Sequence, residues 1–291
     1  FQRIVRSGQC TPNESNVVEI RIRPAITGNS ISAAQQICSG TQPAALTGTT
    51  PSGGSGGFTY RWESSISSAT AGFNPAPGQN TGAGYSPPVL TRDTWFRRVA
   101  ISGGCENPSE AVLISMLPLP NAPILTVQNA RACVGGSATL TVANANGNTI
   151  EWFDAPTGGS PLFVGTTFVT PELNGNTTFY VQARNNNNCT NATRTAVNVT
   201  VVTPVADAGP DVTIIQGRPA ELRASGGVSY QWEPAASLSN ANVSNPVARP
   251  DVTTTYTVTI TTEEGCTATD EVTVTVIPAI TAPNAFSPNG D

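Results

Sequence analysis

Short stretches in which apolar and polar residues alternate recur along the whole chain. The clearest is Val272–Val276, where valine alternates with threonine, so that the valines can face a core and the threonines can face water. Gly- and Asn-rich turns separate such stretches at short intervals. Runs of helix-forming residues with apolar positions every 3.6 residues are missing from the sequence, so the pattern predicts a chain of short β-strands.

The alternation is organised into a repeat that is marked by Trp62, Trp152 and Trp232. Each Trp follows a Gly- or Asn-rich turn, and after each come an aromatic strand, a polar hairpin with a cysteine and a closing strand. A unit of about 80 to 95 residues, with roughly seven strands and a Trp on the third, is typical of a two-sheet sandwich of immunoglobulin type. We therefore expect the three tryptophans in the cores.

Proline-containing linkers set the expected domain boundaries. The opening FQRIVRSGQC resembles FRRVAISGGC at Phe96–Cys105, which closes a later unit, so the chain is expected to begin with the last hairpin of a truncated repeat. The expected parts are this hairpin, three immunoglobulin-like repeats and a linker: residues 1–24, 25–118, 119–203, 204–278 and 279–291. The predicted fold class is all-β, with β-sandwiches in an elongated tandem array.

Composition supports strands and turns and narrows the range of partners. Only 11% of the 291 residues are charged, and the chain has 27 Gly and 24 Pro. The net charge of −5 comes without a basic stripe, so we expect no nucleic-acid partner. No stretch reaches the roughly 18 apolar residues that a transmembrane segment needs.

The sequence lacks the side chains on which most active sites depend. It contains no His, and all 14 basic residues are Arg, so there is no Lys either. This removes the usual general base, the usual metal nitrogen ligand and the Schiff-base amine. We expect no enzyme activity and no cofactor.

Calcium is the one metal that the sequence leaves open. Carboxylates gather near the expected junctions, at Asp207, Asp211, Asp251, Glu263 and Glu264. Calcium prefers such hard oxygen ligands, but no loop here has the alternating acidic residues of a dedicated site. Solvated turn residues are the simpler interpretation.

Two parts of the sequence resemble a known family. The third repeat, from DAGPDVTIIQG to EVTVTVIP, looks like the PKD-like repeats of Bacteroidota surface proteins, and the second, with EWFDAPTGGSPLFVG, looks like the sister repeat in such arrays. Residues 280–291, ITAPNAFSPNGD, are similar to the opening of the C-terminal domain of gliding-motility-associated cargo of the type IX secretion system. The residues that carry this signature are Pro283, Asn284, Phe286, Ser287, Pro288, Asn289, Gly290 and Asp291.

The resemblance implies a place in the cell and a role. It implies export by the type IX machinery, display at the cell surface in association with the outer membrane, and an adhesin stalk ahead of a sorting domain. An extracellular surface or a polysaccharide would then be bound through regions upstream. Two alternatives remain: a carbohydrate- or protein-binding immunoglobulin-like module, which exposed residues around Trp95 would favour, or the stalk of a surface enzyme whose catalytic domain lies upstream.

The six cysteines occupy two places in the repeat. Two precede the second strand and four lie in the last hairpin: Cys38 and Cys133, then Cys10, Cys105, Cys189 and Cys266. An exported chain normally pairs its cysteines. Pairing within repeats would join Cys38 to Cys105 and Cys133 to Cys189, and would leave Cys266 as a free thiol.

Sandwich geometry favours a different pairing. The first turn lies at the end where the chain leaves a sandwich and the last hairpin at the end where it enters, about 25 Å away for a strand of about eight residues. A disulfide spans about 7 Å between Cα atoms at most. The hypothesis is therefore that Cys38 bonds Cys189 and Cys133 bonds Cys266, each joining one repeat to the next, with both schemes left open at this point.

Overall fold

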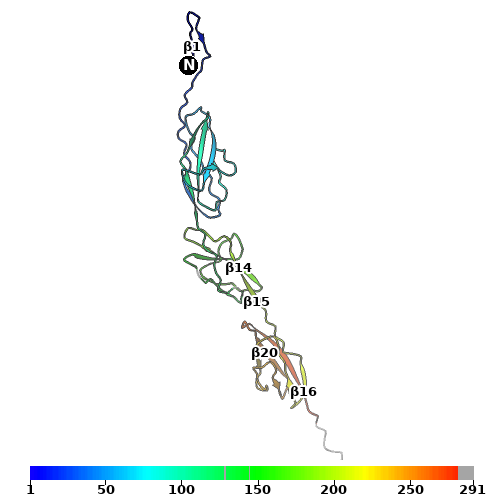
Figure 1. Ribbon diagram of the computed structural model, residues 1–291. Helices are drawn as coiled ribbons and strands as arrows, with labels where there is room; N and C mark the ends of the chain where they lie inside the picture. The colour runs from blue at the N-terminus through cyan, green and yellow to red at the C-terminus, as the bar shows by residue number, and fades with distance from the viewer. Residues whose placement is uncertain (128, 144, 281–291) are drawn as a thin grey trace, which may run out of the picture. The chain divides into compact units, whose positions relative to one another are not determined.

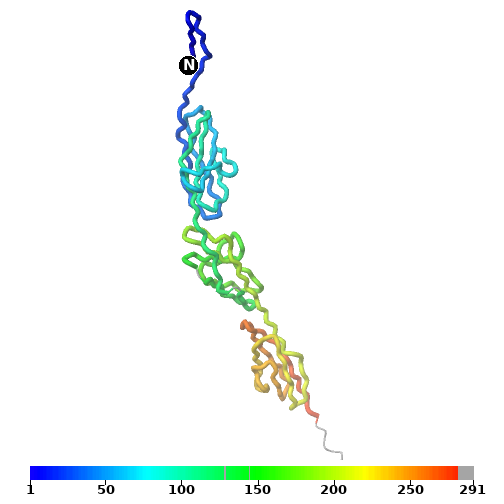
Figure 2. Tube along the Cα trace, in the orientation of Figure 1, coloured from blue at the N-terminus to red at the C-terminus, as the bar shows by residue number. Residues whose placement is uncertain are grey.

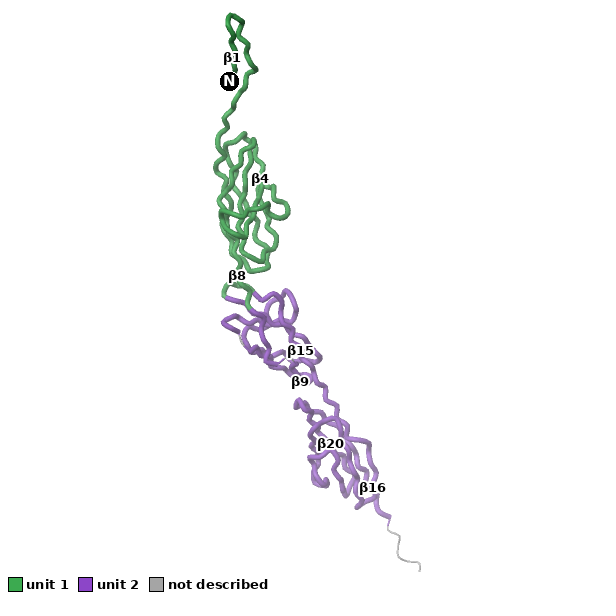
Figure 3. Tube along the Cα trace, in the orientation of Figure 1, with its two compact units in different colours: residues 1–120, 186–189 green, residues 121–185, 190–291 purple. Residues whose placement is uncertain are grey.

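The computed structural model describes residues 1–127, 129–143 and 145–280, and in that part of the chain it contains strands and no helix. The chain divides into two compact units (Figure 3). Unit 1 is Phe1–Pro120 with Asn186–Cys189, and unit 2 is Asn121–Asn185 with Thr190–Asp291. Figure 2 follows the chain through each unit by colour.

The first sandwich lies in unit 1. Its main sheet has the order β3-β8-β6-β4-β5, with β7 also paired to β6. The bounds are β3 Gln35–Cys38, β4 Thr59–Ser65, β5 Asn74–Pro75, β6 Thr94–Ser102, β7 Cys105–Pro108 and β8 Val112–Leu117. All pairs are antiparallel except β3 with β8. Single bridges such as Leu46↔Tyr85 build the facing layer.

Trp62 on β4 is the centre of this core. Its side chain is fully buried, stacks on Tyr85 with ring centroids 5.7 Å apart, and donates its Nε1–H to the Gly82 carbonyl at 3.0 Å. Phe96 and Ile114, from β6 and β8, complete the apolar cluster. The hydrogen bond satisfies the one polar atom of the indole and offsets the cost of removing it from water.

A buried arginine lies beside this apolar core. Arg98 on β6 has no exposed surface, and its guanidinium donates to Asn29 Oδ1 at 2.8 and 2.9 Å, to the Ala83 carbonyl at 2.9 Å and to the Thr49 carbonyl at 2.5 Å. A Cβ on Gly48 would approach Arg98 Nη1 to 2.2 Å, so only glycine fits there. Burial lowers the pKa of Arg98, and neutral acceptors rather than a carboxylate hold the charge.

The second sandwich lies in unit 2. Its main sheet has the order β12-β11-β14-β15-β9, and β10 pairs with β13 in the facing layer. The bounds are β9 Asn129–Cys133, β10 Thr139–Thr141, β11 Thr149–Phe153, β12 Phe163–Val164, β13 Thr167–Val169, β14 Thr177–Arg184 and β15 Thr195–Val202. β9 runs parallel to β15. β14 is the antiparallel neighbour of β15 on its other side (Figure 1). Trp152 is fully buried and donates to the Gly165 carbonyl at 2.9 Å.

A polar network covers one face of this sheet. The Glu151 carboxylate accepts from Arg184 Nε at 2.9 Å and from Gln182 Nε2 at 2.6 Å. Arg194 donates to Gln182 Oε1 at 3.0 Å and lies over the Phe153 ring, 3.3 Å from its centroid. Burial of Glu151 opposes its ionisation, but the hydrogen bonds from Arg184 and Gln182 outweigh burial and lower its pKa.

The third sandwich also lies in unit 2. Its main sheet has the order β16-β21-β20-β18, and β17 pairs with β19 in the facing layer. The bounds are β16 Val212–Ile215, β17 Ala220–Glu221, β18 Ser229–Glu233, β19 Val247–Ala248, β20 Thr254–Thr261 and β21 Thr267–Ile277. β16 runs parallel to β21. Trp232 is fully buried and donates to the Val243 carbonyl at 3.0 Å.

Residues 1–25 form an exposed hairpin rather than a sandwich. β1 (Ile4–Val5) pairs with β2 (Asn13–Glu14), and every residue from Phe1 to Ala25 is exposed. The sequence predicts this segment as a closing hairpin, and the structure gives it hairpin pairing with no facing layer.

Arg98→Lys is expected to destabilise the first sandwich by about 2 kcal/mol or more, because an ammonium group cannot satisfy all the acceptors that the buried guanidinium reaches. Hydrogen exchange of the β4 and β6 amides measures the loss separately from the other sandwiches. The matched control is Arg97→Lys, at the half-buried partner of Glu63, which should cost less than about 1 kcal/mol. Equal losses in both variants would contradict the role assigned to Arg98.

Glu151→Gln is expected to make the stability of the second sandwich depend less on pH in the acid range. Because the folded-state pKa of Glu151 is lowered, its stabilisation is fully present above the ordinary value of 4.5 and is lost as the pH falls through the folded value. The variant should be less stable at pH 7 and should lose less stability between pH 5 and pH 3. Hydrogen exchange of the β11 and β14 amides across this range tests it, with exposed Glu172→Gln as control. Parallel curves for wild type and Glu151→Gln would refute it.

Candidate functional site

The cysteine-bearing strand of the first sandwich ends where the chain leaves that sandwich. β3 runs parallel to the last strand, β8, and Cys38 is opposite Leu117 at the end of both. β6 runs the other way and leads into the turn before Cys105. Cys38 and Cys105 therefore lie at opposite ends of one sheet, and a disulfide between them is excluded.

Cys38 is bonded to Cys189 instead, with the Cα atoms 5.5 Å apart. Cys189 lies in the turn between β14 and β15, has 1% of its surface exposed, and joins unit 1 together with Asn186–Asn188. This bond covalently ties the last hairpin of the second repeat to the first repeat. We call the Cys38–Cys189 bond the first staple.

The second staple is the bond between Cys133 and Cys266, whose Cα atoms are 5.4 Å apart. Cys133 ends β9, opposite Val202 of the parallel strand β15, and Cys266 lies in the turn between β20 and β21. Cys266 has 1% of its surface exposed. The two staples use the same two positions of the repeat, which is the inter-repeat pairing and not the pairing within repeats.

An ion pair accompanies the second staple. Arg131, two residues before Cys133, donates from Nη1 to Glu264, two residues before Cys266. Hydrogen bonds from the Glu264 amide itself and from Thr262, and then the charge of Arg131, lower the pKa of Glu264. The pair is partly exposed and contributes little to stability by itself.

Cys10 and Cys105 are exposed and carry free thiols. Both lie in the same hairpin position as Cys189 and Cys266, Cys10 between β1 and β2 and Cys105 after β6. The third repeat has Ile215 at the end of its first strand, where the other two repeats have Cys38 and Cys133. The staple positions thus follow the repeat from one sandwich to the next.

Three of the five carboxylates considered for calcium have partners within the chain. Asp207 Oδ1 accepts the Gly209 N–H at 2.9 Å and Asp211 Oδ1 accepts the Thr273 N–H at 2.7 Å, while Glu264 pairs with Arg131. Asp251 and Glu263 are exposed. Within the described residues, no three His, Cys, Asp or Glu side chains are grouped so that they could hold a metal ion. Nor does that part of the chain hold a helix with the length and apolarity to cross a membrane.

Trp95 is half-buried on the outer face of β6, next to the fully packed Phe96. Two positions along, Arg97 lies over the Phe73 ring at 4.0 Å from its centroid and pairs with Glu63 at 2.7 Å. Alternation along the strand explains why Trp95 faces outward while Phe96 is buried, because one of two neighbouring aromatics must face outward. Trp95 and Phe73 thus lie on an outer face of the first sandwich that contains partly exposed aromatic side chains.

Sequence reasoning missed Arg98 and its partner Asn29. A signal existed, since Arg3 stands in FQRIV where Arg98 stands in FRRVA, and an arginine kept at an inward strand position needs a buried acceptor. The eight residues of the expected secretion signature, from Pro283 to Asp291, lie outside the described residues.

Two family models match parts of the chain. Residues 120–204 match an Ig-like domain described as CHU_C associated, and residues 27–118 match a domain of unknown function, DUF8696. No curated protein sequence matches the chain at a significant level.

Solved structures with tandem domains are similar to the chain at low identity. An I-band fragment of titin has 11% identity and a TM-score of 0.35, with 89% of this chain and all of that chain covered. A Bacteroides ovatus protein of a mixed-linkage glucan utilization locus, SGBP-B, solved with a mixed-linkage heptasaccharide, has 13% identity, a TM-score of 0.23 and coverages of 90% and 72%.

The N-terminal eight Ig domains of Down Syndrome Cell Adhesion Molecule have 12% identity and a TM-score of 0.26, and the chain spans 42% of their length while 87% of it is covered. Such likenesses transfer no ligand. The strand topology and the match over residues 120–204 confirm the prediction of tandem immunoglobulin-like β-sandwiches, which are modules of the structural or binding kind.

Proposed function

We propose that this chain is a non-catalytic stalk segment of a secreted cell-surface adhesin, and that its work is to carry load between its ends. The observation that carries the proposal is the order of the two staples along the chain. The first staple joins Cys38 to Cys189 and the second joins Cys133 to Cys266, so the two covalent loops overlap between Cys133 and Cys189. While both staples hold, the shortest covalent path along the chain therefore runs backwards through residues 133–189.

The overlap limits how far the chain stretches under force. Load entering at Phe1 crosses to Cys189 at the first staple and must return to Cys133 before it crosses to Cys266. Only about 120 residue steps can then be drawn out, or about 410 Å at roughly 3.5 Å per residue, against about 1,000 Å for the reduced chain. A segment that stays short under tension is suited to a tether.

Display outside the cell is consistent with the chemistry of the chain. Disulfides persist in oxidising compartments, and four of the six cysteines are paired. The similarity of residues 280–291 to a type IX sorting domain supports export by that system, association with the outer membrane and a role in gliding motility as further parts of the proposal. The adhesion ligand would then be bound by other regions.

A second candidate is a binding module, favoured by the outer face with Trp95, Phe73 and Arg97. Aromatic rings beside a charged pair suit stacking on a sugar ring. Trp95→Ala would then abolish binding of an oligosaccharide to the whole chain, whereas a stalk tolerates the substitution without change in its extension.

The stalk proposal predicts a short final length in single-molecule pulling. With the ends attached, the oxidised chain is expected to extend to about 410 Å and the chain in dithiothreitol to about 1,000 Å. Pairing within repeats would instead give about 580 Å when oxidised, so the measurement separates the two schemes. An oxidised length near that of the reduced chain would refute a load-limiting role.

A matched control removes the free thiols. The double variant Cys10→Ser/Cys105→Ser keeps both staples and should extend as far as the wild type. Cys133→Ser/Cys266→Ser opens the second loop only, and its oxidised length should rise to about 490 Å.

A further inference from the structure

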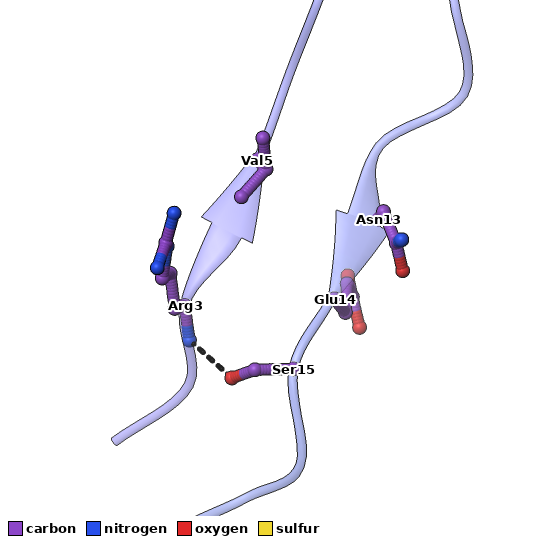
Figure 4. Close-up of a pocket in the computed structure, with 5 residues that line it drawn as sticks. All are labelled: Arg3, Val5, Asn13, Glu14 and Ser15. Carbon is purple, nitrogen blue, oxygen red and sulfur yellow. Dashed lines mark hydrogen bonds between the residues drawn. The ribbon is translucent and has the colours of Figure 1, made fainter.

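The N-terminal hairpin repeats the hydrogen bonds of the hairpin that closes the first sandwich. The Arg3 N–H donates to Ser15 Oγ at 2.9 Å (Figure 4), and the Ser15 N–H donates to the Arg3 carbonyl at 2.9 Å. In the first sandwich the Arg98 N–H donates to Ser109 Oγ at 3.1 Å and the Ser109 N–H donates to the Arg98 carbonyl at 2.8 Å. The two hairpins therefore pair their strands in the same way, although the turn of the N-terminal hairpin is one residue longer.

The same correspondence holds at the other end of the hairpin. Phe1 and Val18 exchange both backbone hydrogen bonds, at 2.7 and 2.8 Å, and Phe96 is paired with Val112. Val5 is paired with Asn13 as Ala100 is paired with Asn107. Residues 1–23 thus have the strand register of a closing hairpin.

The side chains that should face a core have nothing over them. Phe1 is 84% exposed and Ile20 is 66% exposed, whereas their counterparts Phe96 and Ile114 are 1% and 0% exposed. Val5, Val18 and Ile22 are exposed as well. In the first sandwich the segment before Phe96, residues 25–95, supplies the cover. The hairpin is one half of a sandwich by its own side chains.

A hollow of about 240 Å³ in the hairpin marks where one covering side chain belongs. It is lined by Arg3, Val5, Asn13, Glu14 and Ser15 (Figure 4). At the matching place in the first sandwich, Asn29 donates to the carbonyls of Arg98 and Asn107 at 3.0 and 2.6 Å and accepts from the guanidinium. The hollow therefore has the donors and acceptors that an asparagine side chain uses.

The free thiol of Cys105 lies beside the far end of this half-sandwich. Arg23 donates to the carbonyl of Gly103, two residues before Cys105, at 2.6 Å. When the N-terminal hairpin is matched to the hairpin that closes the first sandwich, Arg23 corresponds to Leu117. Leu117 is opposite Cys38 on the parallel strand β3. A strand added parallel to residues 18–23 in the same register would place its cysteine opposite Arg23, next to the turn that holds Cys105.

We infer that residues 1–23 and Cys105 together form a docking site for the front half of an immunoglobulin-like repeat of the kind seen in residues 25–95. The occupant supplies an asparagine to the hollow at Arg3, a tryptophan core to Phe1 and Ile20, and a strand-end cysteine to Cys105. One element thus covers the apolar face and bonds the free thiol. The inference extends the staple pattern to a third junction and does not depend on a load-bearing function.

The staple at Cys105 is a two-electron oxidation. The thiolate of the incoming cysteine first attacks glutathione disulfide, forms a mixed disulfide and releases one glutathione thiolate. The thiolate of Cys105 then attacks the cysteine sulfur of this mixed disulfide, forms the new S–S bond and releases the second glutathione thiolate. Over both steps the two thiols give up two electrons and two protons, and one glutathione disulfide becomes two glutathione molecules.

The test joins a copy of residues 25–95 ahead of Phe1 of the full chain and folds the product in a glutathione redox buffer. The copied Cys38 is expected to bond Cys105, so that free thiols fall from two in the present chain to one, Cys10. Non-reducing peptide mapping identifies the bond, and hydrogen exchange of residues 1–22 should slow by at least about tenfold as the hairpin enters a sheet.

Two variants of the joined chain separate the parts of the inference. With the copied cysteine replaced by serine, the hairpin amides should stay protected although no third disulfide forms. With Ile20→Asp the protection should be lost, whereas Ile20→Val should keep it. Protection without a bond to Cys105 overturns the staple, and unprotected hairpin amides in both the joined chain and its serine variant overturn the docking site. Neither result touches the pulling lengths of the present chain.

Discussion

The direction of one strand decides how this molecule is held together. In each sandwich the first strand of the main sheet runs parallel to the last, so a cysteine at its end lies where the chain leaves. The hairpin cysteine follows a strand that runs the opposite way, about 25 Å from that end. Because a disulfide spans about 7 Å between Cα atoms at most, the two cysteines of one repeat cannot meet. Cys38 and Cys133 instead bond the hairpin cysteine of the next repeat.

The cores beneath these junctions combine one repeated feature with two local ones. A fully buried Trp that donates to a backbone carbonyl lies in all three sandwiches. The first sandwich adds a buried arginine held by neutral oxygens, and the second adds a carboxylate held by one arginine and one glutamine on the sheet face. These networks specify the register of neighbouring strands, since a slip of one residue would leave a buried charge without hydrogen-bond partners.

The sequence predicts what alternation and spacing encode. Trp62 stands out by its turn and its downstream strand, and the two cysteine positions follow from the repeat plus the length of a strand. Arg98 could not be distinguished in the same way, because alternation says only that it faces inward, and the acceptor that makes this tolerable, Asn29, lies 69 residues away in the chain. The outward position of Trp95 was equally undecided, since either aromatic of the Trp95–Phe96 pair could have been the buried one.

The overlap of the two covalent loops affects the unfolded state of the second repeat in particular. Residues 133–189 lie inside both covalent loops, so that segment loses more conformational freedom in the unfolded state than either loop alone would remove. A sandwich placed there refolds from a chain whose two ends are already tethered to its neighbours. The polypeptide link and the disulfide give each junction two covalent connections.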